Sequence, residues 1–278
     1  MLGKPPPSPS QTPPSDESAP AAALRYVRAV PTREEAGTRW VAGVDGCRSG
    51  WVVVLRECVT GELRARVAPA FDAVLAQAEA PWVVGVDMPI GLLPAGAAGG
   101  RTCEVLARRL LGPRSSSLFS APTRSALEAF RAGGGYRAVS LANRGAPSGP
   151  GLSRQAFGLL SKISEVDRAL PTARCRIVEV HPELSFREAN GGRVVETRKR
   201  TAEGRRERLE VLARHGYTFP LALLARPGRT FPAGAKPDDL LDACVACWTA
   251  ERVARGTAVV LPGDCPLDAR GLRMELWR

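Results

Sequence analysis

Four acidic residues stand where apolar segments end or are interrupted. Asp45 closes the run RWVAGV, and Asp87 closes the run WVVGV. Glu179 lies inside CRIVEV, and Asp242 lies on the apolar face of DLLDACVACW. A carboxylate in such a setting is costly unless it is paired or binds a metal, and Mg²⁺ and Mn²⁺ prefer oxygen ligands. If these segments converge, the four carboxylates are predicted to be catalytic and to bind Mg²⁺ or Mn²⁺.

Phosphodiester hydrolysis is the chemistry that such a site suits. In two-metal sites, ions about 4 Å apart activate a water molecule and stabilise the leaving oxygen. Other polar residues lie close by in the sequence: His181 and Glu183 follow the third segment, and Asp238 and Asp239 precede Asp242. Residues three and four positions before Asp242 share its face in a helix, so they are further candidates.

Each of these residues also has a simpler structural interpretation. Asp45 before a glycine can form a hairpin turn, and Asp87 before Met-Pro can cap the next segment. Glu179 can point to the opposite face of its strand and pair with an arginine. Asp238 can be a helix N-cap, and Asp239 can be a favourable charge in the first helical turn. His181 can be a hydrogen-bonded structural residue.

The apolar patterns around these residues predict an α/β protein. Three runs separated by short turns predict an antiparallel meander over residues 39–46, 50–57 and 62–69. Two later apolar runs predict buried strands over 82–89 and 175–183. Helices are predicted over 71–80, within 101–170, over 200–216 and from Asp238 to 256, with a short strand in 271–278. Asp45 and Asp87 each end a predicted strand, and ligands bind at such carboxyl ends in open α/β sheets. If the two strands are neighbours, the two carboxylates lie side by side.

This order of elements is that of the ribonuclease H-like fold. We therefore expect a ribonuclease H-like mixed sheet, with three antiparallel strands plus parallel strands, flanked by helices. A helical insertion follows the fourth strand. The domain is predicted to span residues 39–278.

Length and composition distinguish residues 1–38 from the rest of the chain. The 278-residue chain is 44% hydrophobic, which suffices for a core, whereas its first part is rich in proline and serine and is expected to be a disordered tail. No apolar run approaches the roughly 20 residues of a membrane span, and the start lacks the layout of a secretory signal. The seven scattered cysteines do not suggest a disulfide framework, and Cys244 and Cys247 are expected to be buried in a helix. We predict a cytoplasmic protein without a membrane partner; the sequence does not indicate an oligomeric state.

The charge of the chain favours a polyanionic partner. The net charge is +11 and the isoelectric point is near 10.0, so DNA or RNA is the expected partner. Arginine supplies nearly all of this charge, and a basic face that only binds solvent is the alternative.

Seven blocks of the sequence, in order, resemble the uncharacterised proteins of domain-of-unknown-function family 429. The blocks are GVDGCRSGWV, VGVDMPIGL, RTCEVLARRLLGPRSSSLFSAPTR, SRQAFGLLSKISEVD, VEVHPELSF, KRTAEGRRERL and PDDLLDACVACWTA. The resemblance extends from about Trp40 to the C-terminus. That family is regarded as predicted ribonuclease H-like nucleases, related in fold to Holliday-junction resolvases. The resemblance implies six candidate metal ligands, with Glu183 as a rival of Glu179: Asp45, Asp87, Glu179, Glu183, Asp239 and Asp242.

The same blocks carry polar residues that suit a phosphate backbone. Hydroxyl and guanidinium groups position a backbone without reading its bases. The candidate substrate-binding residues are Arg114, Ser115, Ser116, Arg124, Lys162 and Lys199. Helix caps and solvent-exposed faces are the alternative roles for these residues.

The expected function is that of a divalent-metal-dependent nuclease, a hydrolase of phosphodiester bonds. A catalytically silent nucleic-acid-binding or scaffold protein is one alternative. A nucleotide-dependent phosphotransferase is the other, because DGCRSGW resembles the first phosphate loop of actin-type and sugar-kinase proteins. ATP turnover would favour the phosphotransferase, and nucleic-acid binding that survives loss of the carboxylates would favour the silent protein. The fold alone does not choose among these classes.

Overall fold

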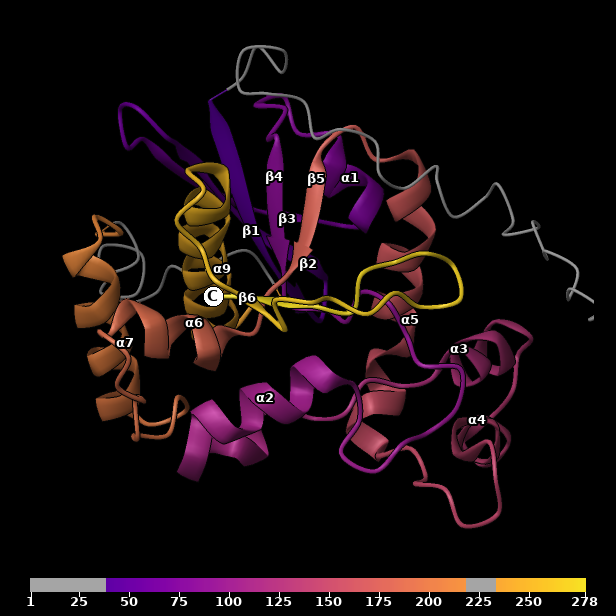
Figure 1. The fold of residues 1–278 in the computed structure, drawn as a ribbon. Helices are drawn as coiled ribbons and strands as arrows, with labels where there is room; N and C mark the ends of the chain where they lie inside the picture. Colours follow the sequence, from indigo (N-terminus) through magenta and orange to yellow (C-terminus); the bar gives the residue numbers. More distant parts are fainter. Residues whose placement is uncertain (1–38, 219–233) are drawn as a thin grey trace, which may run out of the picture.

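A mixed sheet of five strands, in the order β3-β2-β1-β4-β5, forms the centre of the fold (Figure 1). The computed structural model describes residues 39–218 and 234–278. The tail predicted for residues 1–38 lies outside the described residues. The strands are β1 (Trp40–Cys47), β2 (Gly50–Glu57), β3 (Leu63–Ala68), β4 (Val83–Val86) and β5 (Arg176–Glu179).

The first three strands form the predicted meander. Strand β1 pairs with β2 in an antiparallel register that ends with Cys47 opposite Gly50, so only two residues form the turn. Gly50 has a φ of 139°, and a β-carbon there would lie 2.0 Å from the carbonyl oxygen of Ala68. Strands β4 and β5 continue the sheet in parallel beside β1. The predicted α/β fold with a mixed sheet is therefore confirmed.

Helices flank both faces of the sheet and fill the connection between β4 and β5. The connection holds four α-helices and two short 3₁₀ helices, as the predicted helical insertion requires. The α-helices in that connection are α2 (Thr102–Leu111), α3 (Arg124–Arg131), α4 (Tyr136–Arg144) and α5 (Arg154–Ala169). The other α-helices of the described residues are α1 (Phe71–Leu75), α6 (Pro182–Ala189), α7 (Ala202–Arg214) and α9 (Pro237–Ala254). The 3₁₀ helices are η2 (Gly112–Ser117) and η3 (Leu170–Thr172).

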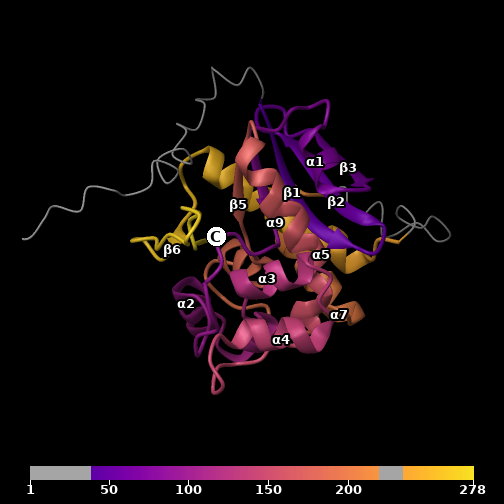
Figure 2. The same ribbon diagram turned by 90° about the vertical axis from the view of Figure 1, so that its right-hand side faces the viewer.

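Alternating side chains of the strands pack against different helices. Helices α1 and α5 cover one face, where Val44 and Val86 pack with Leu160 and Ile163. Helices α6, α7 and α9 cover the other face, as the two views show (Figures 1 and 2). Helices α2, α3 and α4 lie beyond the carboxyl ends of the parallel strands (Figure 1).

Two strand glycines allow α9 to lie directly on the sheet. A β-carbon at Gly43 in β1 would lie 2.0 Å from the backbone nitrogen of Cys247 and 2.2 Å from the carbonyl oxygen of Ala243. At Gly85 in β4, it would lie 2.8 Å from the carbonyl oxygen of Ala246. Glycine within a strand marks such a close backbone approach. The close approach places α9 across β1 and β4. It also brings Asp242, which precedes Ala243, close to the sheet.

A short C-terminal hairpin completes the described fold. Strands β6 (Val260–Leu261) and β7 (Leu276–Trp277) pair with each other, so the predicted terminal strand is present but only two residues long. All seven cysteines are free, and Cys244 and Cys247 are fully buried in α9, as predicted. None of the helices in the described residues combines the length and the apolar character needed to cross a membrane.

Candidate metal centre

Three aspartates from different elements meet at the carboxyl ends of the central strands. Val44 of β1 is paired with Val86 of β4, so Asp45 and Asp87 follow at adjacent positions of neighbouring parallel strands. The backbone nitrogen of Asp87 donates to the carbonyl oxygen of Val44 over 3.1 Å. Asp242 lies beside them because it precedes Ala243 in α9, where the helix backbone packs closely against Gly43 of the sheet. The structure thus brings together three of the four acids first singled out from the sequence, and we call them the aspartate centre.

Burial and mutual repulsion favour the protonated forms of this centre. Asp45 and Asp242 are 8% and 3% exposed, respectively, whereas Asp87 is partly accessible. Burial, followed by the charges of Asp242 and Asp87, raises the pKa of Asp45 well above its ordinary value. Burial, with the charge of Asp242, raises the pKa of Asp87 to about 8. Burial also raises the pKa of Asp242, to about 6, although a nearby lysine opposes the increase. The protein therefore holds three carboxyl groups that resist ionising together.

Lys199 is the cation of this centre. Its Nζ donates to Oδ2 of Asp242 over 2.5 Å. Burial alone would lower the pKa of Lys199, but Asp242, Asp87 and Asp45 raise it above its ordinary value. Within the described residues, no other lysine or arginine forms an ion pair with the three aspartates. One ammonium group thus faces three carboxyl groups.

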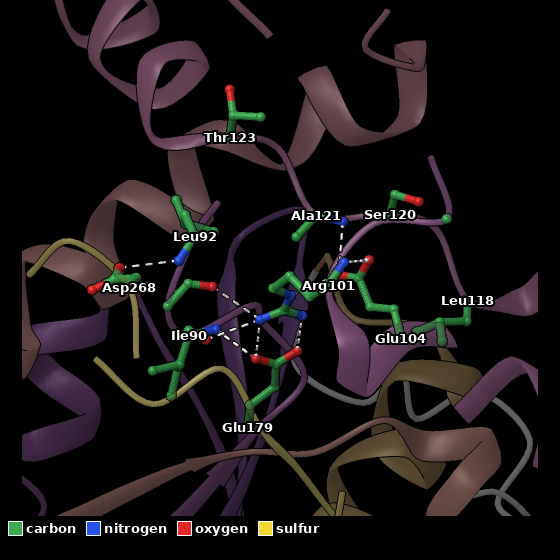
Figure 3. A network of polar contacts seen from close by, with 12 residues as sticks. Ile90, Leu92, Arg101, Glu104, Leu118, Ser120, Ala121, Thr123, Glu179 and Asp268 are labelled. Atoms are coloured by element: carbon green, nitrogen blue, oxygen red, sulfur yellow. Dashed lines mark hydrogen bonds and ion pairs between the residues drawn. The ribbon is translucent and has the colours of Figure 1, made fainter. Parts of the chain in front are cut away.

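Glu179 binds a buried arginine and does not contact the aspartates. Nη1 and Nη2 of Arg101 donate to Oε2 and Oε1 of Glu179 over 2.7 and 2.5 Å, and Figure 3 shows this paired contact. Arg101 also donates to Glu104 from Nε, over 2.8 Å. Burial raises the pKa of Glu179, and Arg101 opposes that rise. The alternative interpretation of Glu179, pairing with an arginine, describes its observed contact, although its charge still raises the pKa of Asp87.

The same arginine fixes the loop that follows Asp87. Arg101 Nη1 donates to the carbonyl oxygens of Ile90 and Gly91, and the nitrogen of Ile90 donates to Glu179 (Figure 3). Further along the same loop, the backbone nitrogen of Leu92 donates to Oδ2 of Asp268 over 3.0 Å. A charge-assisted network therefore holds the backbone just beyond the aspartate centre.

Glu183 is also bound by arginine. Nη2 of Arg208 lies 2.8 Å from both carboxylate oxygens of Glu183, and Nη2 of Arg114 lies 3.3 Å from Oε1. Arg208 is fully buried in α7. His181, just before Glu183, is neutral because burial lowers its pKa to about 4. Its Nδ1 has no hydrogen-bond partner among the described residues.

The start of α9 differs from the sequence prediction. The helix begins at Pro237 with Lys236 as its N-cap, so the prediction that it starts at Asp238 with that residue as N-cap is wrong. Oδ2 of Asp239 accepts a hydrogen bond from the nitrogen of Lys236 over 2.8 Å, as in a capping box. Proline suits the first helical position because its missing N–H is not needed there. Asp239 therefore caps the helix, although its charge contributes to the raised pKa of Asp45.

The candidate substrate-binding residues lie in different surroundings. Arg124 is buried and pairs with Asp167 and Asp268 over 2.7 and 2.8 Å, so both of these contacts are structural. Lys162 Nζ donates to the carbonyl oxygen of Gly50. The remaining four lie near the centre or on a partly exposed 3₁₀ helix: Lys199, Arg114, Ser115 and Ser116.

The aspartate centre fits a cation in charge and in donor type. Oδ1 of Asp242 is buried and has no hydrogen-bond partner among the described residues. A buried oxygen without a partner is costly, and a hard cation satisfies it. Over residues 39–218 and 234–278, however, no group of three or more His, Cys, Asp or Glu is arranged to hold a metal ion as it stands. The carboxylates supply suitable ligands, but Lys199 now holds one of their oxygens.

Sequence reasoning missed the two buried arginines, although both carry a signal. Arg101 stands at the start of α2, where a positive charge opposes the helix dipole. Arg208 precedes Val211 and Leu212 by three and four positions, so it shares their buried face of α7. A charge in either position requires an anionic partner. These partners are Glu179 and Glu183.

The sequence profile of the family described as "Protein of unknown function (DUF429)" matches residues 43–266. This chain belongs to the DUF429 family. The matched range includes all three residues of the aspartate centre, together with Lys199, Glu179 and its partner Arg101. Neither a curated protein nor a solved structure matches the chain.

Proposed function

We propose that this DUF429 protein is a divalent-metal-dependent nuclease with a ribonuclease H-like fold. The convergence of Asp45, Asp87 and Asp242 with a single ammonium group is the observation that carries the proposal. Three carboxyl groups that resist ionising together are stabilised by a cation of higher charge. The order of strands and helices supports the ribonuclease H-like assignment, and the net charge of +11 supports a nucleic-acid substrate.

The aspartate centre would hold Mg²⁺ or Mn²⁺ through its carboxylate oxygens. When bound there, the ion would supply the activation of a water molecule and the stabilisation of charge on the leaving oxygen. Lys199 and Arg114 are the basic side chains at this end of the sheet that can orient a phosphate group. Glu179 and Arg101 hold the loop after Asp87 and so keep that carboxyl group in position.

Cleavage over a panel of substrates tests the proposal. Single-stranded, duplex, hybrid and branched DNA and RNA are incubated with Mg²⁺ or Mn²⁺, with and without a chelator. We expect metal-dependent cleavage of at least one substrate by the wild type and none by Asp45→Asn. Asp264→Asn is the matched control, because Asp264 is exposed and lies in the C-terminal segment outside the centre. Equal cleavage by wild type and Asp45→Asn would contradict the proposal.

A catalytically silent nucleic-acid-binding protein is the second candidate. Arginines already neutralise Glu179 and Glu183, and Lys199 already contacts Asp242, so this end of the sheet has stabilising contacts without a metal. Nucleic-acid binding that persists in Asp45→Asn, in a protein without cleavage activity, would favour this candidate.

A further inference from the structure

Two kinds of cation neutralise the acids at the carboxyl end of the sheet. Glu179 and Glu183 each face a buried guanidinium group that makes two hydrogen bonds, from Arg101 and Arg208, whose side chains are 2% and 0% exposed. The aspartate centre instead faces Lys199, whose side chain is 36% exposed. A buried guanidinium group with two hydrogen bonds to one carboxylate is held firmly, whereas an ammonium group on a flexible stem makes a single contact and can leave.

The surroundings of Lys199 allow its side chain to move while its backbone stays in place. Nη1 of Arg208 donates to the carbonyl oxygen of Thr197, and Nη1 of Arg205 donates to that of Arg200, over 3.0 and 3.1 Å. These contacts anchor the segment on both sides of Lys199 to α7. Rotation of the four-carbon stem can therefore move the ammonium group away from Asp242 without refolding the segment.

The oxygens of Asp242 identify what the movement would expose. Oδ2 accepts from Lys199, and Oδ1 has no hydrogen-bond partner among the described residues. Departure of the ammonium group would leave a buried carboxylate with both oxygens available, beside Asp45 and Asp87. A divalent ion that uses Oδ2 must displace the lysine.

We propose that Lys199 is an exchangeable internal counter-ion, which occupies the centre in the absence of metal and leaves Asp242 when a divalent ion binds. This inference rests on the proposed metal-dependent function and adds its regulation: the metal competes with a residue of the same chain. The exchange keeps the buried Asp242 paired with positive charge in both states. It also explains why the described residues contain acids of suitable type but no preformed metal site.

Metal affinity of lysine variants tests the exchange without an activity assay. Calorimetric titration with Mg²⁺ at pH 8.5 compares wild type, Lys199→Met and Lys199→Arg. In Lys199→Met no ammonium group competes with the ion for Asp242, and a contact between two opposite unit charges about 3 Å apart is worth about tenfold in an equilibrium even at the dielectric constant of water. We therefore expect the Kd of Lys199→Met to fall about tenfold, and that of Lys199→Arg to rise because a guanidinium holds the carboxylate more firmly. Arg206→Met, which removes the same charge from an exposed side chain of α7, should leave the Kd unchanged.

Chemical labelling of wild-type protein gives a second measurement. An amine-acylating reagent is applied with and without Mg²⁺, and modification is quantified by mass spectrometry. Lys199 should become several-fold more reactive with Mg²⁺, because its ammonium group leaves Asp242. The exposed Lys236 serves as an internal reference within the same chain.

The outcomes separate the exchange from the metal site itself. If wild type binds Mg²⁺ and Lys199→Met binds it equally or more weakly, with labelling of Lys199 unchanged, the exchange is wrong and the metal site stands. If neither wild type nor Lys199→Met binds Mg²⁺ or Mn²⁺, the metal site is wrong and the exchange with it. Tighter binding by Lys199→Met, with metal-dependent labelling, supports both.

Discussion

Asp87→Asn is expected to stabilise the metal-free protein at alkaline pH and to leave it nearly unchanged at acidic pH. The folded state raises the pKa of Asp87 from 3.8 to about 8, chiefly through burial and then through Asp242. Between these values the folded protein holds a proton that the unfolded chain has lost. Stability from this group is therefore fully present below the unfolded pKa and is lost as the pH rises through the folded pKa. Asparagine cannot ionise and avoids that loss.

The expected gain in the free energy of unfolding follows from the size of the pKa shift of Asp87. At about 1.36 kcal/mol per pKa unit, a rise from 3.8 to about 8 corresponds to roughly 6 kcal/mol. Asp87 is partly accessible, and it shares its titration with Asp45 and Asp242, so we expect about half of this value. The advantage of Asp87→Asn should then grow from about zero near pH 4 to about 3 kcal/mol near pH 9. For a domain of this size, this corresponds to a rise in Tm of about 6–12 °C.

Urea and thermal unfolding with a chelator present, at several values between pH 4 and pH 9, measure this difference. Asp264→Asn again serves as the control, because its carboxyl group is exposed. A constant difference in the free energy of unfolding across this range would refute the reasoning. So would a variant that loses stability at pH 9, because Asp87 would then be stabilising as a carboxylate.

Three further substitutions test other parts of the structure. Glu179→Gln should lower the free energy of unfolding by about 3 kcal/mol in urea titrations, because the buried Arg101 loses a charged partner; an unchanged midpoint would contradict this. Gly43→Ala should destabilise by about 3 kcal/mol or prevent folding, since the new methyl group meets the α9 backbone; circular dichroism and thermal melts measure this, and normal stability would show that α9 can move away. Adding Asp242→Asn to Asp45→Asn should cost little further metal affinity or cleavage, because residues acting as one unit are not additive; an equal second loss would indicate separate sites.

The positions of two acids could be predicted from strand ends alone. Asp45 and Asp87 close apolar strands, and neighbouring parallel strands bring such residues together. Asp242 could be predicted because it places a charge on the apolar face of α9. The strand order confirms the mixed α/β sheet that the runs of apolar residues predicted.

The partners of the remaining charges could not be predicted from local patterns. Alternation along β5 does not reveal which arginine meets Glu179, because Arg101 is 78 positions away in the chain. Lys199 lies in a segment without periodicity, so its contact with Asp242 depends on how α7 and α9 pack. Glycines in strands signal close approach, but only the tertiary structure shows that α9 makes it at Gly43.

The thermal response of the protein to Mg²⁺ tests the central claim, that Asp45, Asp87 and Asp242 form one cation-binding centre. At a Mg²⁺ concentration about 100 times its Kd, binding to the folded state alone adds about 2.7 kcal/mol, or about 5–10 °C in Tm. The wild type should show this rise at pH 8.5, Asp45→Asn should not, and Asp264→Asn should match the wild type. An absent response in the wild type, or a full response in Asp45→Asn, would contradict the account.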